Sequence, residues 1–404
     1  MSELHLLSPA GFRASGVYAG IKSAQKPDVG LLIADKPCTA AAVFTPNKVF
    51  AAPVKIGRQH IAKGKLRGVV VNSGNANACT GKQGEQDAIR MCQLAAEIAG
   101  CSPYEILPSS TGIIGHLLPM EKVEQGINEA GQYLGSSLEH AMLFGDAIMT
   151  TDLKRKIAAT TVKIGRQKIT LAGICKGAGM IGPRMAPPGK HATMLAYLTT
   201  DAQIPAPMLR KMLADAADLS FNAVTIDDHT STNDTAVIMA SGASGVKVSA
   251  GKSATTFADA LTDVCESLAF QIAADGEGAT KVVEIIVDKA KTLEDARKIA
   301  RAIAVSPLVK CALHGNDPNW GRIVSAAGLA GAAFDPEKAV LVLEGTPVFR
   351  KGRPLQFSAH LISESLKSPE VRIHLSCNLG KHKAIMWTCD LSKDYVSINA
   401  DYHT

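Results

Sequence analysis

Aromatic residues are scarce in this sequence. They make up 4% of its 404 residues, so any core must be built from aliphatic and small side chains. No uninterrupted stretch approaches the roughly 20 apolar residues needed to cross a bilayer. Runs of Lys and Arg with interleaved aromatics are also missing, and a net charge of +6 is small for this length. These absences argue against a membrane protein and against a nucleic-acid-binding protein.

Paired cysteines are a second absence. The nine cysteines are odd in number and widely scattered, and none are spaced as C-x-x-C, so zinc-binding and thioredoxin-like sites have no support. The first residues, MSELHLLSPAGFRASG, lack the basic and apolar regions of a signal peptide. We therefore expect a protein of the reducing cytoplasm with no metal site.

The remaining composition is that of a globular protein, with 46% hydrophobic and 20% charged residues. At about 150 residues per domain, the length predicts two domains. Strand and helix patterns alternate, which favours an α/β or α+β fold. The strands are expected at 68–74, 168–175, 281–287, 339–345 and 371–377, and the helices at 84–100, 206–219, 255–274 and from Thr292.

Two details of these elements can be checked directly. In the helix at 84–100, the periodicity predicts one face formed by Ile89, Cys92, Ala96 and Ala99. The Gly-, Ser- and Ala-rich segment 240–253 is compatible with a hairpin or a surface linker, and we favour the hairpin.

Two short motifs imitate nucleotide-binding loops. GAGMIG (177–182) matches G-x-G-x-x-G, but the prolines that follow at 183, 187 and 188 prevent the helix that a dinucleotide site requires. GKS (251–253) lacks the earlier glycine of a P-loop, because position 246 is Val246. We reject both interpretations.

Several segments are unusually dense in small and polar residues. Taken singly, each is compatible with an ordinary turn or helix cap, but together they favour a ligand pocket assembled from many loops. The segments are NSGNANACTG (72–81), PSSTGIIG (108–115), MTTD (149–152), KGAGMIGPRM (176–185), HATML (191–195), TSTNDT (230–235), GEGATK (276–281), HGNDPNWGRI (314–323) and SINADYHT (397–404).

In this order, the motifs resemble those of the ornithine acetyltransferase (glutamate N-acetyltransferase) family of arginine biosynthesis. The resemblance extends from about residue 40 to the last residue. It implies an α/β fold of the self-processing N-terminal-nucleophile-like type, which the family shares with certain aminopeptidases.

The resemblance also implies that the precursor cuts itself between Ala192 and Thr193. Residues 1–192 would then form an alpha chain and residues 193–404 a beta chain that begins with the nucleophile. A free α-amine has a reference pKa of about 7.7–8.0, so it can accept the hydroxyl proton near neutral pH. Independently of the resemblance, Thr193 is compatible with capping a helix that begins at MLAYL (194–198), and the two roles can coexist.

Acyl transfer also requires donors for a tetrahedral oxyanion, and the resemblance assigns these to Thr111 and Gly112. From the pattern alone, a turn between a strand and a helix explains these two residues equally well.

The family's substrate-contacting residues correspond to Thr150, Lys176, Glu277, Asn399 and Thr404, together with Thr193. Lysine is a natural partner for the α-carboxylates of N-acetylornithine and glutamate. A glutamate can meet a cationic amine or donate a proton to the leaving amine. Because Thr404 is the last residue, its role requires an ordered chain terminus, whereas the ends of a chain are ordinarily frayed.

The implied reaction is ping-pong transfer of acetyl from N2-acetylornithine to glutamate through acetyl-Thr193, with no metal or organic cofactor. The implied assembly is a dimer of alpha–beta pairs (α2β2). Whether acetyl-CoA is a second donor stays open from sequence. The alternatives are a self-processing aminopeptidase or amidase, a relative using another acetyl donor, and a non-catalytic ligand-binding protein.

The sequence departs from the family pattern at three places. APPGKH (186–191) is inserted directly before Ala192, which puts efficient self-cleavage in doubt. His229 stands where the family tends to have smaller or acidic residues, and His403 stands where an arginine is common. We interpret both histidines as tolerated loop substitutions, although His403, beside Thr404, could make substrate binding pH-dependent.

Overall fold

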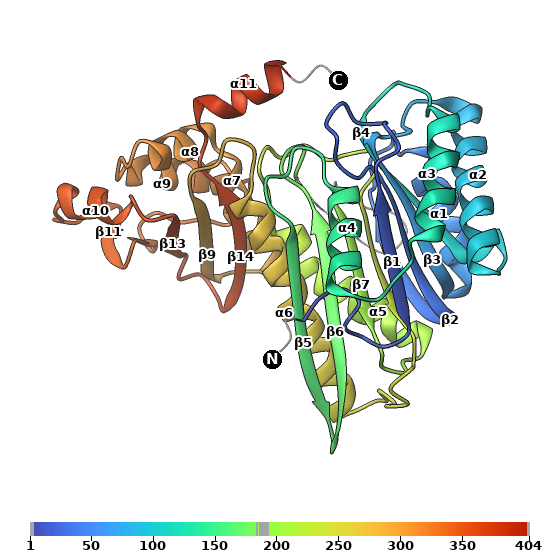
Figure 1. Cartoon of the computed structure of the whole chain (residues 1–404). Helices are drawn as coiled ribbons and strands as arrows, with labels where there is room; N and C mark the ends of the chain where they lie inside the picture. The colour runs from blue at the N-terminus through green and yellow to red at the C-terminus, as the bar shows by residue number, and fades with distance from the viewer. Residues whose placement is uncertain (1–3, 183–184, 186–193, 402–404) are drawn as a thin grey trace. The chain divides into compact units, whose positions relative to one another are not determined.

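The computed structural model describes residues 4–182, 185 and 194–401. The chain packs into two compact units. The first contains Met1–Asn222 and His229–Leu268, and the second contains Ala223–Asp228 and the chain from Ala269. Each unit has its own sheet (Figure 1).

Within the described residues, the first unit is built on an eight-stranded mixed sheet of order β4-β3-β2-β8-β7-β6-β5, with β1 paired to β2. The pairs β3–β4 and β7–β8 are parallel, and the other neighbours are antiparallel. The strands are β1 Phe12–Val17, β2 Val29–Phe44, β3 Lys65–Asn75, β4 Ile106–Ile113, β5 Lys156–Ile164, β6 Gln167–Lys176, β7 Leu195–Thr200 and β8 Thr235–Ala240.

Helices cover both faces of this sheet, because successive residues of its central strands are apolar. On one face Leu31 and Ile33 pack with α2 and α3, and on the other Leu32 packs with Phe144 of α4. The helices are α1 Ala52–His60, α2 Gly81–Ala99, α3 Met120–Gln132, α4 Leu138–Ile148, α5 Ala206–Leu219 and α6 Lys252–Ala274, which runs on into the second unit. Three short 3-10 helices lie at Ile61–Lys63, Pro103–Glu105 and Phe221–Ala223.

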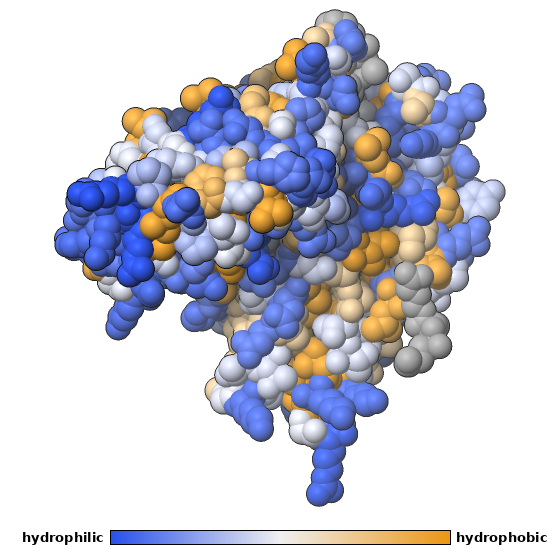
Figure 2. Space-filling model, turned by 90° about the vertical axis from the view of Figure 1, so that its left-hand side faces the viewer, coloured by the Kyte–Doolittle hydropathy of each residue, from blue (hydrophilic) through white to orange (hydrophobic). Residues whose placement is uncertain are grey.

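Strand β5 is an edge of the sheet and forms a hairpin with β6. The end of this hairpin lies at the bottom of the first unit in Figure 1 and is strongly hydrophilic in Figure 2. Lys163, Arg166 and Lys168 are exposed there. Charged side chains at such an edge oppose pairing with other chains.

The second unit contains a six-stranded sheet of order β12-β11-β10-β13-β9-β14 in the described residues, in which only β9 and β13 are parallel. Ile299 and Ile303 of α7 and Ile323 of α9 pack with the sheet residues Val283 and Ile285. The elements are β9 Val282–Ala290, β10 Val340–Leu343, β11 Thr346–Arg350, β12 Arg353–Pro354, β13 Glu370–Ser376, β14 His382–Cys389, α7 Leu293–Val305, α8 Pro307–His314, α9 Trp320–Gly328, α10 Ala359–Ser365 and α11 Lys393–Asp401.

The α/β class and the positions of the strands and helices predicted from sequence are confirmed, apart from three details. Segment 240–253 is not a hairpin: after β8 it forms turns, with Lys247 making an isolated bridge to Gln203 before α6 begins. The residues after Met194 form strand β7, so the helix expected at MLAYL is wrong. Ile89 is 40% exposed and lies off the buried face of α2, which is centred instead on residues such as Met91 and Ala95.

Rejection of the dinucleotide motif is confirmed, since no helix opens at 177–182. No helix among the described residues is long and apolar enough to span a membrane.

Candidate active site

Thr111 and Gly112 lie at the carboxyl end of β4, beside the end of β3. The parallel register pairs Thr111 with Ser73 and Gly112 with Gly74. Gly112 has a φ of +133°, and a Cβ there would lie 2.3 Å from the carbonyl carbon of Gly74. Only glycine fits this position, so the backbone is open where the sequence predicts oxyanion donors. These residues are in a strand, which excludes the alternative of a strand-to-helix turn.

A buried amide connects this backbone to the loop before β8. Asn233 Nδ2 donates to the carbonyl oxygens of Ser110, at 2.8 Å, and Ala76, at 2.6 Å. Ser110 Oγ in turn donates to Asn72 Oδ1 at 2.6 Å. We call Asn233 with its two carbonyl acceptors the Asn233 bridge. Asn233 was not among the predicted site residues, although its segment TSTNDT was singled out.

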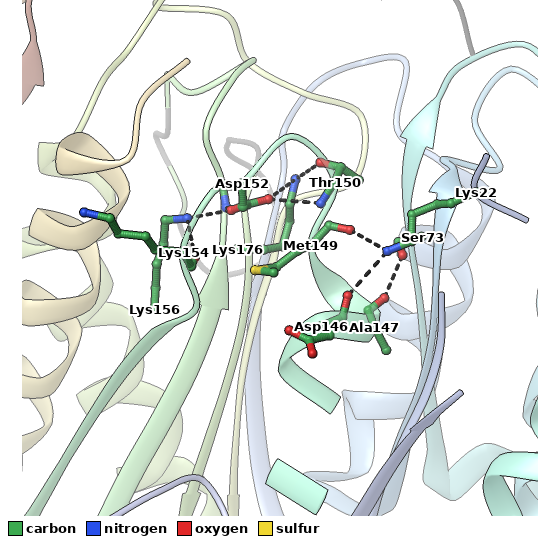
Figure 3. A network of polar contacts seen from close by, with 11 residues as sticks. Lys22, Ser73, Asp146, Ala147, Met149, Thr150, Asp152, Lys154, Lys156 and Lys176 are labelled. Carbon is green, nitrogen blue, oxygen red and sulfur yellow. Dashed lines mark hydrogen bonds and ion pairs between the residues drawn. The ribbon is translucent and has the colours of Figure 1, made fainter. Parts of the chain in front are cut away.

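Lys176 and Thr150, both predicted to bind substrate, are in direct contact (Figure 3). Lys176 is the last residue of β6, and its Nζ donates to Thr150 Oγ1 at 2.8 Å. Asp152 receives a hydrogen bond from Lys156 Nζ at 2.7 Å and lies 3.8 Å from Lys176 Nζ. The backbone N–H of Thr150 also donates to Asp152, at 3.1 Å. We call Thr150, Asp152, Lys156 and Lys176 the Asp152 cluster.

The Asp152 cluster is buried and contains two lysines and one aspartate. The side chains of Lys156, Lys176 and Asp152 are 1%, 5% and 0% exposed. Burial alone would raise the pKa of the Asp152 carboxyl, but the ammonium groups of Lys176 and Lys156 lower it below its ordinary value. Asp152 is therefore a carboxylate whose single charge is shared between two cations. An incoming anion would be stabilised beside Lys176.

Lys22 and Ser73 hold the helix end that leads into Thr150 (Figure 3). Lys22 Nζ donates to the carbonyl oxygen of Met149 at 3.0 Å, and Ser73 Oγ donates to that of Ala147 at 2.7 Å. Ala147 lies in the last turn of α4 and Met149 caps its carboxyl end, where helix acceptors have no partner within the helix. Burial lowers the pKa of Lys22 to about 8. Neither residue was predicted, because their partners are more than seventy positions away in the chain.

The start of β7 and the start of β8 lie side by side next to the predicted cleavage site. The N–H of Thr235 donates to the carbonyl of Met194 at 2.8 Å. Asp234 is fully buried, and neither of its carboxyl oxygens has a hydrogen-bond partner among the described residues. Burial raises the pKa of Asp234 well above its ordinary range. Ala192, Thr193 and the insertion at 186–191 lie outside the described residues.

Two further predicted residues meet within the second unit. Asn399, on α11, donates from Nδ2 to Glu277 Oε2 at 2.8 Å. Gly278 allows this contact, because it has a φ of +68° and a Cβ there would lie 2.5 Å from the backbone nitrogen of Tyr395 in α11. Thr404 and His403 lie outside the described residues, and His229 is exposed.

The motif HGNDPNWGRI supports the loop that carries Glu277. Asp390 accepts hydrogen bonds from the N–H of Thr280 at 2.8 Å and of Lys281 at 3.0 Å, and His314 Nδ1 lies 2.7 Å from its second oxygen. Lys281 Nζ donates to Asn316 Oδ1. Burial opposes ionisation of Asp390, but these hydrogen bonds lower its pKa. His314 and Asn316 thus serve the geometry of the loop.

Metal ligation has no support in the part of the chain that the structure describes, where no group of three or more His, Cys, Asp and Glu residues could hold an ion.

Comparison with known proteins identifies the family. Its model, described as the ArgJ family, matches residues 13–404. The chain belongs to the ArgJ family. Relatives named Arginine biosynthesis bifunctional protein ArgJ, from Dehalococcoides mccartyi (strain CBDB1) and Symbiobacterium thermophilum, are each 46% identical. The alignments cover 99% and 98% of this chain, and 97% and 98% of the relatives.

Solved structures of this family are also similar to the chain. A crystal structure of Arginine biosynthesis bifunctional protein ArgJ from Bacillus halodurans is 38% identical, with a TM-score of 0.49, and covers 50% of this chain and 97% of that chain. The resemblance drawn from the sequence motifs is confirmed, and with it the assignment to the acyltransferases of arginine biosynthesis.

Proposed function

We propose that this ArgJ-family protein transfers the acetyl group of N2-acetylornithine to glutamate through an acetyl ester of Thr193. The observation that carries the proposal is the contact of Lys176 with Thr150 in a cluster where one carboxylate serves two cations. Both substrates carry an α-carboxylate, an anion that the buried Lys176 ammonium can bind. A charge-assisted hydrogen bond of this kind contributes about 1.5–3 kcal/mol.

The first step is self-cleavage. The Thr193 hydroxyl attacks the carbonyl of Ala192, and the acyl group moves from nitrogen to oxygen, which frees the Thr193 amine. Hydrolysis of the resulting ester then restores the Thr193 hydroxyl and leaves Ala192 with a carboxylate. Strand β6 of the alpha chain pairs with β7 of the beta chain, and β2 pairs with β8. Because both expected chains contribute strands to one sheet, they remain associated after the bond is cut.

The free amine of Thr193 then acts as general base. It takes the hydroxyl proton as the oxygen attacks the acetyl carbonyl, and it returns the proton to the leaving nitrogen of ornithine when the carbon–nitrogen bond breaks. Thr111 and Gly112 stabilise the oxyanion. Glutamate attacks the resulting ester by the reverse sequence, which gives N-acetylglutamate and restores the hydroxyl. Glu277, Asn399 and Thr404 complete substrate binding, with Glu277 as partner for the ornithine side-chain ammonium.

A second activity is favoured by the word "bifunctional" in the names of the relatives. We propose acetyl-CoA as an alternative acetyl donor to the same Thr193, with no other cofactor. The proposed assembly is α2β2, which light scattering on the purified protein tests directly. The proposed location is the cytoplasm.

Intact mass and an acetyl-transfer assay test the main proposal. Wild type is expected to give two chains divided after Ala192 and to convert glutamate with N-acetylornithine to N-acetylglutamate. Thr193→Ala is expected to remain a single chain without activity, because it has no hydroxyl. An uncut wild type that transfers no acetyl group would overturn the proposal. Replacing N-acetylornithine with acetyl-CoA in the same assay tests the second activity.

A further inference from the structure

The strand that follows the predicted nucleophile in the chain, β7, and the strand that carries the predicted oxyanion donors, β4, are not neighbours in the sheet. Thr193 immediately precedes Met194 at the start of β7, whereas Thr111 and Gly112 end β4, and β8, β2 and β3 lie between these strands in the sheet. Strand pairing alone therefore sets their separation only through three intervening strands. Acyl transfer requires the reacting atoms to be held within a fraction of an ångström, and a misplacement of 1 Å costs roughly 10²-fold in rate.

A more direct connection crosses the end of the sheet through Asn233. On one side, Thr235, two residues further on, donates its N–H to the carbonyl of Met194 at 2.8 Å. On the other side, Asn233 Nδ2 binds the carbonyl of Ser110 at 2.8 Å, and Ser110 shares a planar peptide with Thr111. The route from Met194 to Thr111 thus passes through two hydrogen bonds and three consecutive residues of the chain.

The amide of Asn233 can be oriented in only one way. Its Oδ1 accepts from the hydroxyl of Thr232, so Nδ2 must face the two carbonyl groups. Its two N–H groups match two acceptors, because Ala76 O lies 2.6 Å away and Ser110 O lies 2.8 Å away. Ala76 is itself tied to β4, since its N–H donates to Ile113 O at 2.9 Å. Asn233 is 4% exposed, so water has little access to these groups. Removing the hydrogen bonds would therefore leave buried polar groups without partners, which costs free energy.

We infer that Asn233 is a positioning residue, which sets the distance between the nucleophile strand and the oxyanion donors without touching substrate. The inference rests on the proposed roles of Thr193, Thr111 and Gly112. It assigns Asn233 an effect on the chemical step and not on substrate binding, because no hydrogen bond between described residues joins the Asp152 cluster to the Asn233 bridge.

Asn233→Asp tests this inference, because it keeps the shape and removes both donors. The expected result, per processed active site, is a fall of about 10²-fold in kcat with KM for N-acetylornithine changed by less than about 3-fold. Active sites are counted by intact mass and by the burst of ornithine release. Asn233→Ser, which adds no charge beside the carbonyls, is expected to lower kcat in the same sense.

The matched control is Asn47→Asp. Asn47 Nδ2 donates to the carbonyl of Thr230 at 2.8 Å, so this variant loses an amide-to-carbonyl bond to the same loop without reaching β3 or β4. Its kcat is expected to stay near that of wild type. If Asn233→Asp and Asn233→Ser lose only thermal stability and keep the kcat of Asn47→Asp, the inference is wrong while the proposed function stands. Failure of wild type to transfer acetyl would instead remove the proposed function.

Discussion

Two buried polar clusters of the first unit solve different problems with different chemistry. The Asp152 cluster is ionic: Asp152 is a carboxylate between Lys156 and Lys176, with distances of 2.7 and 3.8 Å to their ammonium groups. The Asn233 bridge is neutral and uses one amide to hold two backbone carbonyls. A cluster of buried lysines around one carboxylate is suited to binding an anion, whereas a neutral and fully matched one is suited to fixing geometry.

Asp234, next to Asn233, makes the contrast sharper. Like Asp152 it is buried, but among the described residues no ion pair and no hydrogen bond to its carboxyl oxygens is found. The environments shift the two pKa values in opposite directions, down for Asp152 and up for Asp234. Burial therefore does not decide the charge of a carboxyl group; its partners do.

The largest effect is expected for Asp152→Asn. This variant leaves Lys156 and Lys176 buried without their shared anion, and breaking a buried ion pair in this way costs about 3–5 kcal/mol. Because the folded pKa of Asp152 is lowered, its stabilisation is present above about pH 4 and is lost as pH falls further. Urea unfolding at pH 7 measures the loss.

The control for Asp152→Asn is Asp215→Asn. Asp215 forms an i,i+4 pair with Lys211, as Asp152 does with Lys156, but both partners are exposed. Its loss is expected to change the free energy of unfolding by about 0.5 kcal/mol or less. Equal losses for the two variants would contradict the ionic description of the cluster.

Lys176→Met is expected to have the next largest effect, and on activity instead of folding. Asp152 keeps Lys156 as a partner, so the fold survives, but the proposed substrate carboxylate loses its cation. Loss of a charged hydrogen bond of about 1.5–3 kcal/mol raises KM for N-acetylornithine roughly 10- to 150-fold. Since the carboxylate is bound equally before and during reaction, kcat should change little. Steady-state kinetics with Lys211→Met as control measures this, and an unchanged KM would exclude Lys176 as the carboxylate partner.

Four of the site residues that the sequence predicts singly form two pairs in the structure. Lys176 binds Thr150, and Glu277 binds Asn399, each at 2.8 Å. These residues stand in Gly-rich or small-polar motifs, which carry a local signal. The family resemblance supplied their roles.

The residues that sequence reasoning missed act through distant partners. Asn233 binds a carbonyl 123 positions away, and Lys22 binds one 127 positions away, which no local pattern reports. The errors in local structure have a related cause. A short, largely apolar segment such as Leu195–Thr200 suits a helix or a strand equally, and pairing with β6 and β8 decides for the strand.

The smallest effect is expected for Asp234→Asn. The pH dependence of its effect on the free energy of unfolding has the opposite sign to that of Asp152→Asn. An acid whose pKa is raised by folding ionises more readily when unfolded, so wild-type stability falls as pH rises above about 4, until the folded pKa is passed. Asn removes this ionisation, although its buried amide needs partners of its own and offsets part of the gain. The free energy of unfolding of the variant, minus that of wild type, should therefore be about 1–2 kcal/mol larger at pH 7 than at pH 4.5. Urea unfolding at both pH values, with Asp215→Asn as control, measures the difference. A difference that shrinks with rising pH would mean that Asp234 is ionised in the folded protein, and the contrast with Asp152 would disappear.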